Sequence, residues 1–117
     1  MLKTVRSEIR PGEVIDTHVH IGGPAGENEA MYFWSSRFEK SLAFEGIKLV
    51  TRIAPSRMSA SRYVTVLFNQ VRNARHVDKV VLLAMDAVHR EDGTPDREAT
   101  HLFVSNPFIG HLAQIYP

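Results

Sequence analysis

The sequence predicts an α/β fold with parallel strands, and three segments carry this prediction. Residues 14–20 alternate apolar and polar side chains as a strand does, and apolar side chains recur at helical spacing after Ser59. Residues 78–86 form a continuous apolar segment of strand length. A strand, a helix and a second strand in this order are typical of a parallel βαβ unit.

The composition of the 117 residues excludes several classes of protein. Hydrophobic residues make up 44%, which is too apolar for a disordered chain, yet no apolar segment reaches the ~18 residues of a membrane span. A net charge of +1 argues against nucleic acid as a partner. The absence of cysteine excludes disulfides, thiolate metal sites and cysteine nucleophiles. The N-terminus has no apolar region of the signal-peptide type, so we expect a cytoplasmic protein without a membrane partner.

The first predicted element follows a polar leader. Residues 1–13 are charged and contain the breaker pair Pro11-Gly12, so we expect them to precede the domain of residues 14–117. The strand at residues 14–20 ends at Gly22-Gly23-Pro24. Its alternation predicts Ile15, Thr17 and Val19 on one face and Asp16, His18 and His20 on the other.

The next stretch predicts a helical excursion. Residues 29–44 carry apolar side chains near helical spacing, with Asn28 as the N-cap and Gly46 as the stop, and residues 47–53 are expected to be extended. An aromatic cluster lies in this stretch. We expect it to pack in the core, with a substrate-pocket wall as the alternative. Its members are Met31, Tyr32, Phe33, Trp34 and Phe38.

The second half of the chain predicts a helix, a strand, a loop and a helix. The helix from Ser59 carries one apolar stripe, formed by Ala60, Val64, Leu67, Phe68 and Val71. The strand at residues 78–86 has the composition of a parallel strand buried on both faces. Residues 87–99 are a polar loop with an Asp92-Gly93 turn. Asn106 and Pro107 then begin a helix that continues to about Tyr116.

Two strands leave large surfaces of a parallel sheet uncovered. A complete eight-stranded βα barrel needs about 250 residues, more than this chain has. The sequence therefore predicts an incomplete parallel α/β unit.

The pair His18 and His20 is the candidate metal site. Residues two apart on a strand project from the same face with Cα atoms roughly 6.5–7 Å apart. Two imidazoles can then ligate one ion at about 2.0–2.1 Å. Neutral imidazole suits zinc, and also iron, nickel or manganese with carboxylate ligands. The alternative is a pair of polar side chains on a solvated strand face.

Three further residues are candidates for orienting a ligand or contacting substrate. Asp16 precedes the histidines on the same strand, and Asp86 ends the second strand. His89 lies in the loop of residues 87–99, which would act as a lid or else as a solvated surface loop. For Asp16 the alternative is a structural carboxylate, and for Asp86 a cap of the next turn.

The segment VIDTHVHIGG resembles the first-strand Asp-x-His-x-His motif of the amidohydrolase superfamily, and more narrowly of its amidohydrolase-2 group. The segment beginning VDKVVLLAMD is similar to the second strand, loop and helix of such proteins, so the resemblance covers residues 14–24 and 78–117. It implies the N-terminal part of a (β/α)8 TIM barrel, about two βα units with an inserted helical excursion. It also implies that His18 and His20 ligate a divalent metal, with zinc expected first.

The resemblance implies a metal-dependent hydrolase whose ion activates water against an amide, ester or lactone, or supports decarboxylation, of a small-molecule substrate. The later histidine ligands and catalytic Asp of the family have no counterpart in this sequence, so we expect residues 1–117 alone to be inactive. The alternatives are a small non-catalytic α/β interaction module and a decayed paralogue that acts by association with a partner chain. Self-association into a homo-oligomer stays open.

Overall fold

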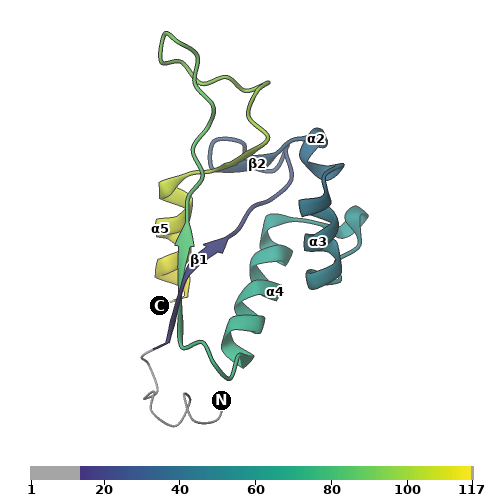
Figure 1. Cartoon of the computed structure of the whole chain (residues 1–117), viewed down its shortest axis with the longest axis vertical. Helices are drawn as coiled ribbons and strands as arrows, with labels where there is room; N and C mark the ends of the chain where they lie inside the picture. The colour runs from purple at the N-terminus through teal and green to yellow at the C-terminus, as the bar shows by residue number, and fades with distance from the viewer. Residues whose placement is uncertain (1–13, 117) are drawn as a thin grey trace.

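The computed structural model describes residues 14–116, which form two small sheets and four α-helices (Figure 1). The parallel sheet pairs β1 with β3, and the antiparallel sheet pairs β2 with β4. In chain order the elements are β1 (Ile15–His20), β2 (Tyr32–Trp34), α2 (Ser36–Glu39), α3 (Leu42–Thr51), a 3-10 turn (Pro55–Arg57), α4 (Ala60–Asn73), β3 (Lys79–Leu83), β4 (Leu102–Val104) and α5 (Asn106–Ile115). Residues 1–13, the expected leader, lie outside the described residues.

The predicted parallel βαβ unit is confirmed. β1 and β3 pair in parallel, with Ile15 opposite Lys79 and His20 opposite Leu83, and α4 connects them along the chain. Ser59 caps α4, because its Oγ accepts a hydrogen bond from the amide of Arg62 at 3.1 Å. The chain therefore has mixed α/β content with a small parallel sheet, and the expected barrel stays a prediction.

The core lies between the parallel sheet and two helices. Ile21, Val64 of α4, Val104 and Leu112 of α5 are buried together, and Leu82 of β3 packs against them. The helices also meet near the end of α5, where the rings of Phe68 and Tyr116 stack with centroids 4.0 Å apart. The predicted apolar stripe of α4 is therefore confirmed as its core face.

The opposite face of the parallel sheet is open. Val81 is 44% exposed and Ile15 is 49% exposed, whereas Val80 and Leu82 on the alternate positions of β3 are partly buried. The prediction that the second strand is buried on both faces is therefore wrong for this chain, and the strand is shorter than residues 78–86. The expectation that two strands leave surface uncovered is confirmed.

The excursion after β1 differs from the sequence prediction. Residues 29–44 are not one helix, because the carbonyl of Asn28 accepts from the amides of Met31 and Tyr32 and turns the chain into β2. Residues 47–53 are not extended either, since α3 continues to Thr51 and ends at Arg52 in the left-handed conformation (φ 56°). Gly46 lies inside α3 and does not stop it. An exposed helical glycine costs only about 1 kcal/mol, which the flanking turns of α3 tolerate.

The small antiparallel sheet holds the carboxyl ends of both parallel strands. The amide of Trp34 donates to the carbonyl of Gly23 at 3.0 Å, and Met85 exchanges two 2.9 Å backbone hydrogen bonds with Val104. β2 and β4, which are three residues each, are not predicted by the sequence pattern. The N-cap of α5 is Ser105, one residue before the predicted Asn106.

Three residues of the aromatic cluster, Tyr32, Phe33 and Trp34, form strand β2, whereas Phe38 lies in α2. All three residues of β2 are buried, and Trp34 is 1% exposed. The Trp34 indole packs among the rings of Phe38, Phe44 and Tyr63, and its Nε1 donates to Glu39 at 3.0 Å. The expectation that the cluster packs in the core is confirmed for Tyr32, Phe33 and Trp34.

Gly23 is the point of closest approach between the end of β1, α4 and β2. A Cβ atom at Gly23 would lie 2.5 Å from Ala60 Cβ and 2.6 Å from Tyr32 Cε2, closer than carbon atoms pack. Only glycine therefore fits where the chain leaves β1.

Gly23→Ala is expected to destabilise the chain by about 1–3 kcal/mol, the cost of overpacking a filled site. Urea unfolding followed by Trp34 fluorescence measures this loss. Gly46→Ala is the matched control. Nothing lies within 4 Å of a Cβ at Gly46, so this variant should gain about 0.5–1 kcal/mol. Equal stability of the Gly23→Ala variant and the wild type would contradict the close approach.

The carboxylate of Glu27 joins the loop after β1 to β2 and α4. Its Oε2 accepts from the Tyr32 hydroxyl at 2.8 Å and from the Ala60 amide at 3.1 Å. Burial, followed by the hydrogen bond and the charge of Glu27, raises the pKa of Tyr32 from 10.0 to about 12. The folded chain therefore favours the neutral phenol.

This raised pKa predicts a loss of stability at alkaline pH. The contribution of Tyr32 is fully present below pH 10, the usual tyrosine pKa, and is lost as pH rises toward the folded pKa of about 12. Urea unfolding on both sides of this window should show a steeper decline for the wild type than for Tyr32→Phe. Parallel declines would contradict the Glu27–Tyr32 contact, because Tyr63 titrates in both proteins.

Candidate metal centre

His18 and His20 lie together at the carboxyl end of β1, as predicted. Their Nε2 atoms are 3.0 Å apart, whereas the ring centroids are 4.8 Å apart with planes at 83°. The rings thus converge at their Nε2 ends. At 3.0 Å the two Nε2 atoms are within hydrogen-bond distance of each other.

The separation of the two nitrogens matches shared metal ligation. Two nitrogens at about 2.0–2.1 Å from one tetrahedral ion lie about 3.3–3.4 Å apart. In octahedral coordination the same bond lengths give about 2.9 Å. The observed 3.0 Å falls close to both, so small ring rotations would suffice to bind an ion.

The strand around the pair is irregular. The β1–β3 register shifts by one residue between Asp16 and Val19, which makes this segment a β-bulge opposite Val81. The alternation of side chains between the two faces of β1, which predicted Asp16 on the histidine face, is therefore interrupted between Asp16 and Val19. The Asp16 carboxylate instead accepts a hydrogen bond from the His18 amide at 3.1 Å and holds the bulge.

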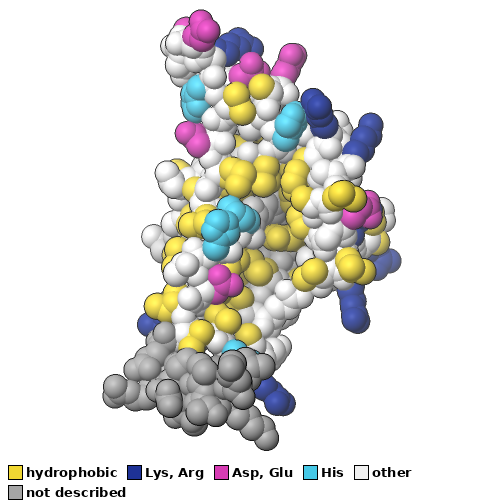
Figure 2. Space-filling model, in the orientation of Figure 1, with side chains coloured by type: hydrophobic (Ala, Val, Ile, Leu, Met, Phe, Trp, Pro, Cys, Tyr) yellow, Lys and Arg dark blue, Asp and Glu magenta, His cyan; other side chains and the backbone are white. Residues whose placement is uncertain are grey.

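The pair is accessible from solvent while its backbone is anchored. His18 is exposed and His20 is partly exposed, but Ile21 directly after them is 3% exposed. The hydroxyl of Tyr63 on α4 donates to the carbonyl of His20 at 3.5 Å. Figure 2 shows histidine side chains bordered by hydrophobic ones on the open face that carries β1.

Asp86 and His89 line a different site. They border a cavity of about 310 Å³ together with Glu29, Phe33, Arg97 and Phe103, and neither His18 nor His20 is among its lining residues. The Asp86 carboxylate accepts a hydrogen bond from the amide of Ala87 at 2.8 Å. This contact fits the alternative in which Asp86 caps the turn after the second strand. The structure therefore brings Asp86 and His89 to one cavity and separates them from the histidine pair.

Sequence reasoning missed Arg97 at this cavity. Its guanidinium lies 3.5 Å from the centroid of the Phe33 ring and pairs with Glu29 at 3.2 Å. The residues are more than 60 positions apart in sequence, so no local pattern could have joined them. His101 contacts Ser35 through Nδ1 at 3.0 Å, which is a structural contact beside the cap of α2.

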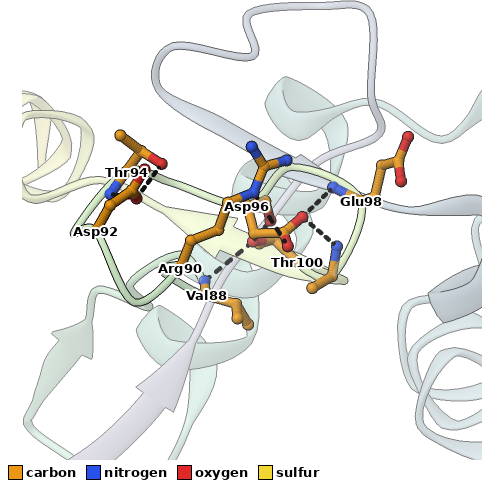
Figure 3. Close-up of polar contacts among 8 residues, drawn as sticks. Val88, Arg90, Asp92, Thr94, Asp96, Glu98 and Thr100 are labelled. Atoms are coloured by element: carbon orange, nitrogen blue, oxygen red, sulfur yellow. Dashed lines mark hydrogen bonds and ion pairs between the residues drawn. The ribbon is translucent and has the colours of Figure 1, made fainter.

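The loop after β3 is braced from within (Figure 3). The Asp96 carboxylate accepts from the amides of Glu98 and Ala99 and pairs with Arg90 at 3.5 Å. Thr100, which is 1% exposed, donates to the Asp96 carbonyl and accepts from the Val88 amide. The hydrogen bond from the Ala99 amide, with smaller contributions from Arg90 and Glu98, lowers the pKa of Asp96. This network closes the loop on itself.

Within residues 14–116 no group of three or more His, Cys, Asp or Glu side chains could hold a metal ion. Two imidazoles alone are fewer than the three or more protein ligands that a catalytic metal site takes.

No protein-family model, curated protein or solved structure matches the chain. Across the part of the chain that the structure describes, the search for a helix long and apolar enough to cross a membrane found none.

Asp96→Ala is expected to loosen residues 87–100, seen as faster amide exchange at Glu98 and Ala99. Asp96→Asn is the control, because an amide oxygen can still accept those hydrogen bonds while the charge that pairs with Arg90 is lost. The lowered pKa sets the pH response: protection is present above the usual aspartate pKa of 3.8 and is lost as pH falls through the lower folded value. Equal exchange in the wild type and Asp96→Ala would contradict the bracing.

Proposed function

We propose that His18 and His20 are the first two ligands of a divalent-metal site in an amidohydrolase-like hydrolase, with zinc as the first candidate ion. The observation that carries this proposal is the convergence of the two Nε2 atoms to 3.0 Å. The same two atoms that share this hydrogen bond are free to ligate one ion after small rotations of the rings. The resemblance of VIDTHVHIGG to the amidohydrolase motif supports the same assignment.

The position of the pair in the fold also supports a hydrolase site. The histidines lie at the carboxyl end of a parallel strand, the edge at which parallel α/β folds build their sites. At this edge the His18 side chain is exposed and the His20 side chain is partly exposed.

A bound divalent ion would lower the pKa of a water ligand and polarise the carbonyl of an amide, ester or lactone, or support decarboxylation. The residues of this chain would hold and orient that ion. The two imidazoles bind it, Asp16 fixes the backbone of His18, and Tyr63 fixes that of His20. The general base and the remaining ligands are assigned to none of the described residues, so residues 14–116 are proposed to bind the ion without turnover.

A non-catalytic interaction module is the second candidate, and the open sheet face favours it. Ile15 and Val81 expose apolar surface that a partner chain could cover. In that case the histidines would be incidental, and zinc would not bind more tightly to the wild type than to a variant without them.

Zinc titration by calorimetry tests the proposal. His18→Ala and His20→Ala should each weaken zinc binding at least about 100-fold, since even the loss of a partner outside the ligand shell costs 10–100-fold. His111→Ala, which removes an exposed histidine of α5, is the matched control and should bind like the wild type. Equal zinc affinity in all four proteins would refute the ligand assignment.

A further inference from the structure

Helix α3 is apolar on two opposite faces. Its Phe44 side chain is 4% exposed and packs against the Trp34 ring, with the centroids 5.4 Å apart, so one face docks on the core. The other face carries Leu42, Leu49 and Val50. These side chains are 90%, 79% and 64% exposed, the highest values among the large hydrophobic residues of the part of the chain that the structure describes. Because a helix that is apolar all round is normally buried or lies in a membrane, we expect a partner to cover this outer face.

The exposed residues form one continuous stripe along α3. Leu42, Gly46, Leu49 and Val50 recur at i, i+4, i+7 and i+8, which is the spacing of a single helix face. Nothing lies within 4 Å of a Cβ atom built at Gly46, so the middle of the stripe is open to solvent. None of the four side chains carries a charge or a hydrogen-bonding group. The stripe therefore offers a partner only apolar contact.

Positive charge flanks the stripe. Residues 36–57 contain five Lys or Arg and two Glu, a net charge of +3, which leaves −2 for the other residues out of the total of +1. The cations before and after α3 are exposed, and they form no ion pair with another described residue. These cations are Arg37, Lys40, Arg52 and Arg57.

Both carboxylates of this segment are engaged within the chain. Glu39 accepts a hydrogen bond from the indole of Trp34 at 3.0 Å, and Glu45 pairs with Lys48 at 2.6 Å. Figure 2 shows hydrophobic side chains over α3 with Lys or Arg side chains around them. The charge that is left beside the stripe to attract a partner is therefore positive.

We propose that α3 docks on an anionic phospholipid surface, with Leu42, Leu49 and Val50 at the boundary of the acyl chains and the flanking cations among the headgroups. Helices that lie in the membrane interface combine an apolar face with Lys and Arg in this way, and anionic lipids attract those cations. Nucleic acid would leave the aliphatic stripe in water. Protein interfaces are enriched in aromatic side chains, which the stripe lacks.

This contact is independent of the proposed metal site. It uses neither His18 nor His20, and it lies on an element that does not position them. The expectation of no membrane partner rests on the lack of a spanning segment, which a contact at the membrane surface does not need.

Co-sedimentation with vesicles of equal parts phosphatidylserine and phosphatidylcholine tests the proposal. The chain should bind these vesicles at least about tenfold more tightly than vesicles of phosphatidylcholine alone, because the cations need anionic headgroups. The double variant Leu42→Ser, Leu49→Ser keeps every charge but loses apolar burial, so it should bind at least about tenfold more weakly. Ile115→Ser is the matched control, since it removes an exposed apolar side chain of α5, and it should bind like the wild type.

A second pair of variants tests the charge. The double variant Arg37→Gln, Lys40→Gln should weaken binding to the anionic vesicles at least about tenfold, because two cations leave the flank of the stripe. The double variant Arg75→Gln, Lys79→Gln lowers the net charge equally at exposed positions between α4 and β3, and it should bind like the wild type.

A fluorescent probe tests insertion of the stripe directly. Because the chain contains no cysteine, Leu49→Cys and Val88→Cys would each take a single environment-sensitive fluorophore. Anionic vesicles should shift the emission to shorter wavelength at position 49, where the probe enters the acyl boundary. The emission at position 88, in the loop after β3, should stay unchanged.

The outcomes separate a lipid surface from other partners. The proposal would be overturned by a lack of binding to anionic vesicles, by equal binding of Leu42→Ser, Leu49→Ser and the wild type, or by unshifted emission at position 49. A dimer in light scattering that only the leucine variant abolishes, without vesicle binding, would also overturn it and assign the stripe to a contact between copies. Zinc titration of the leucine variant should match the wild type, so the lipid contact and the metal site stand or fall separately.

Discussion

The placement of β1, α4 and the small antiparallel sheet relative to one another depends on the close contact at Gly23. The Gly23 carbonyl accepts a hydrogen bond from the Trp34 amide. A Cβ atom at Gly23 would clash with Ala60 and Tyr32, so no side chain fits at this position. This contact joins the parallel sheet to α4 and to the small antiparallel sheet. It lies three residues after His20, so it constrains the path of the chain directly beyond the imidazole pair, whose side chains are exposed (His18) and partly exposed (His20).

The sequence predicted the elements that have a pattern within one segment, although the burial expected for β1 and β3 differs from what the structure shows. The period of two in β1, the apolar stripe of α4 and the apolar composition of β3 each appear in a single segment, and the βαβ unit follows from their order. The excursion could not be predicted in this way. Tyr32, Phe33 and Trp34 form a strand because β4, about 70 residues later, pairs with them, and such long-range pairing overrides helical spacing.

The part of the candidate site that lies within one strand was predicted, and the parts that depend on contacts between segments were not. His18 and His20 come together because both lie on one strand, whereas the β-bulge that separates Asp16 from their alternation depends on the register with β3. Asp86 and His89 face a cavity completed by Arg97 and Phe33, whose contact joins distant segments. Spacing within an element was informative, and contacts between elements required the structure.

X-ray absorption spectroscopy of the zinc-loaded chain shows directly whether the two imidazoles ligate one ion. We expect nitrogen neighbours at about 2.0–2.1 Å with the outer scattering of imidazole rings. That scattering should disappear in the double variant His18→Ala, His20→Ala. A shell of oxygen neighbours alone in the wild type, or imidazole scattering that is unchanged in the double variant, would contradict ligation by the histidine pair.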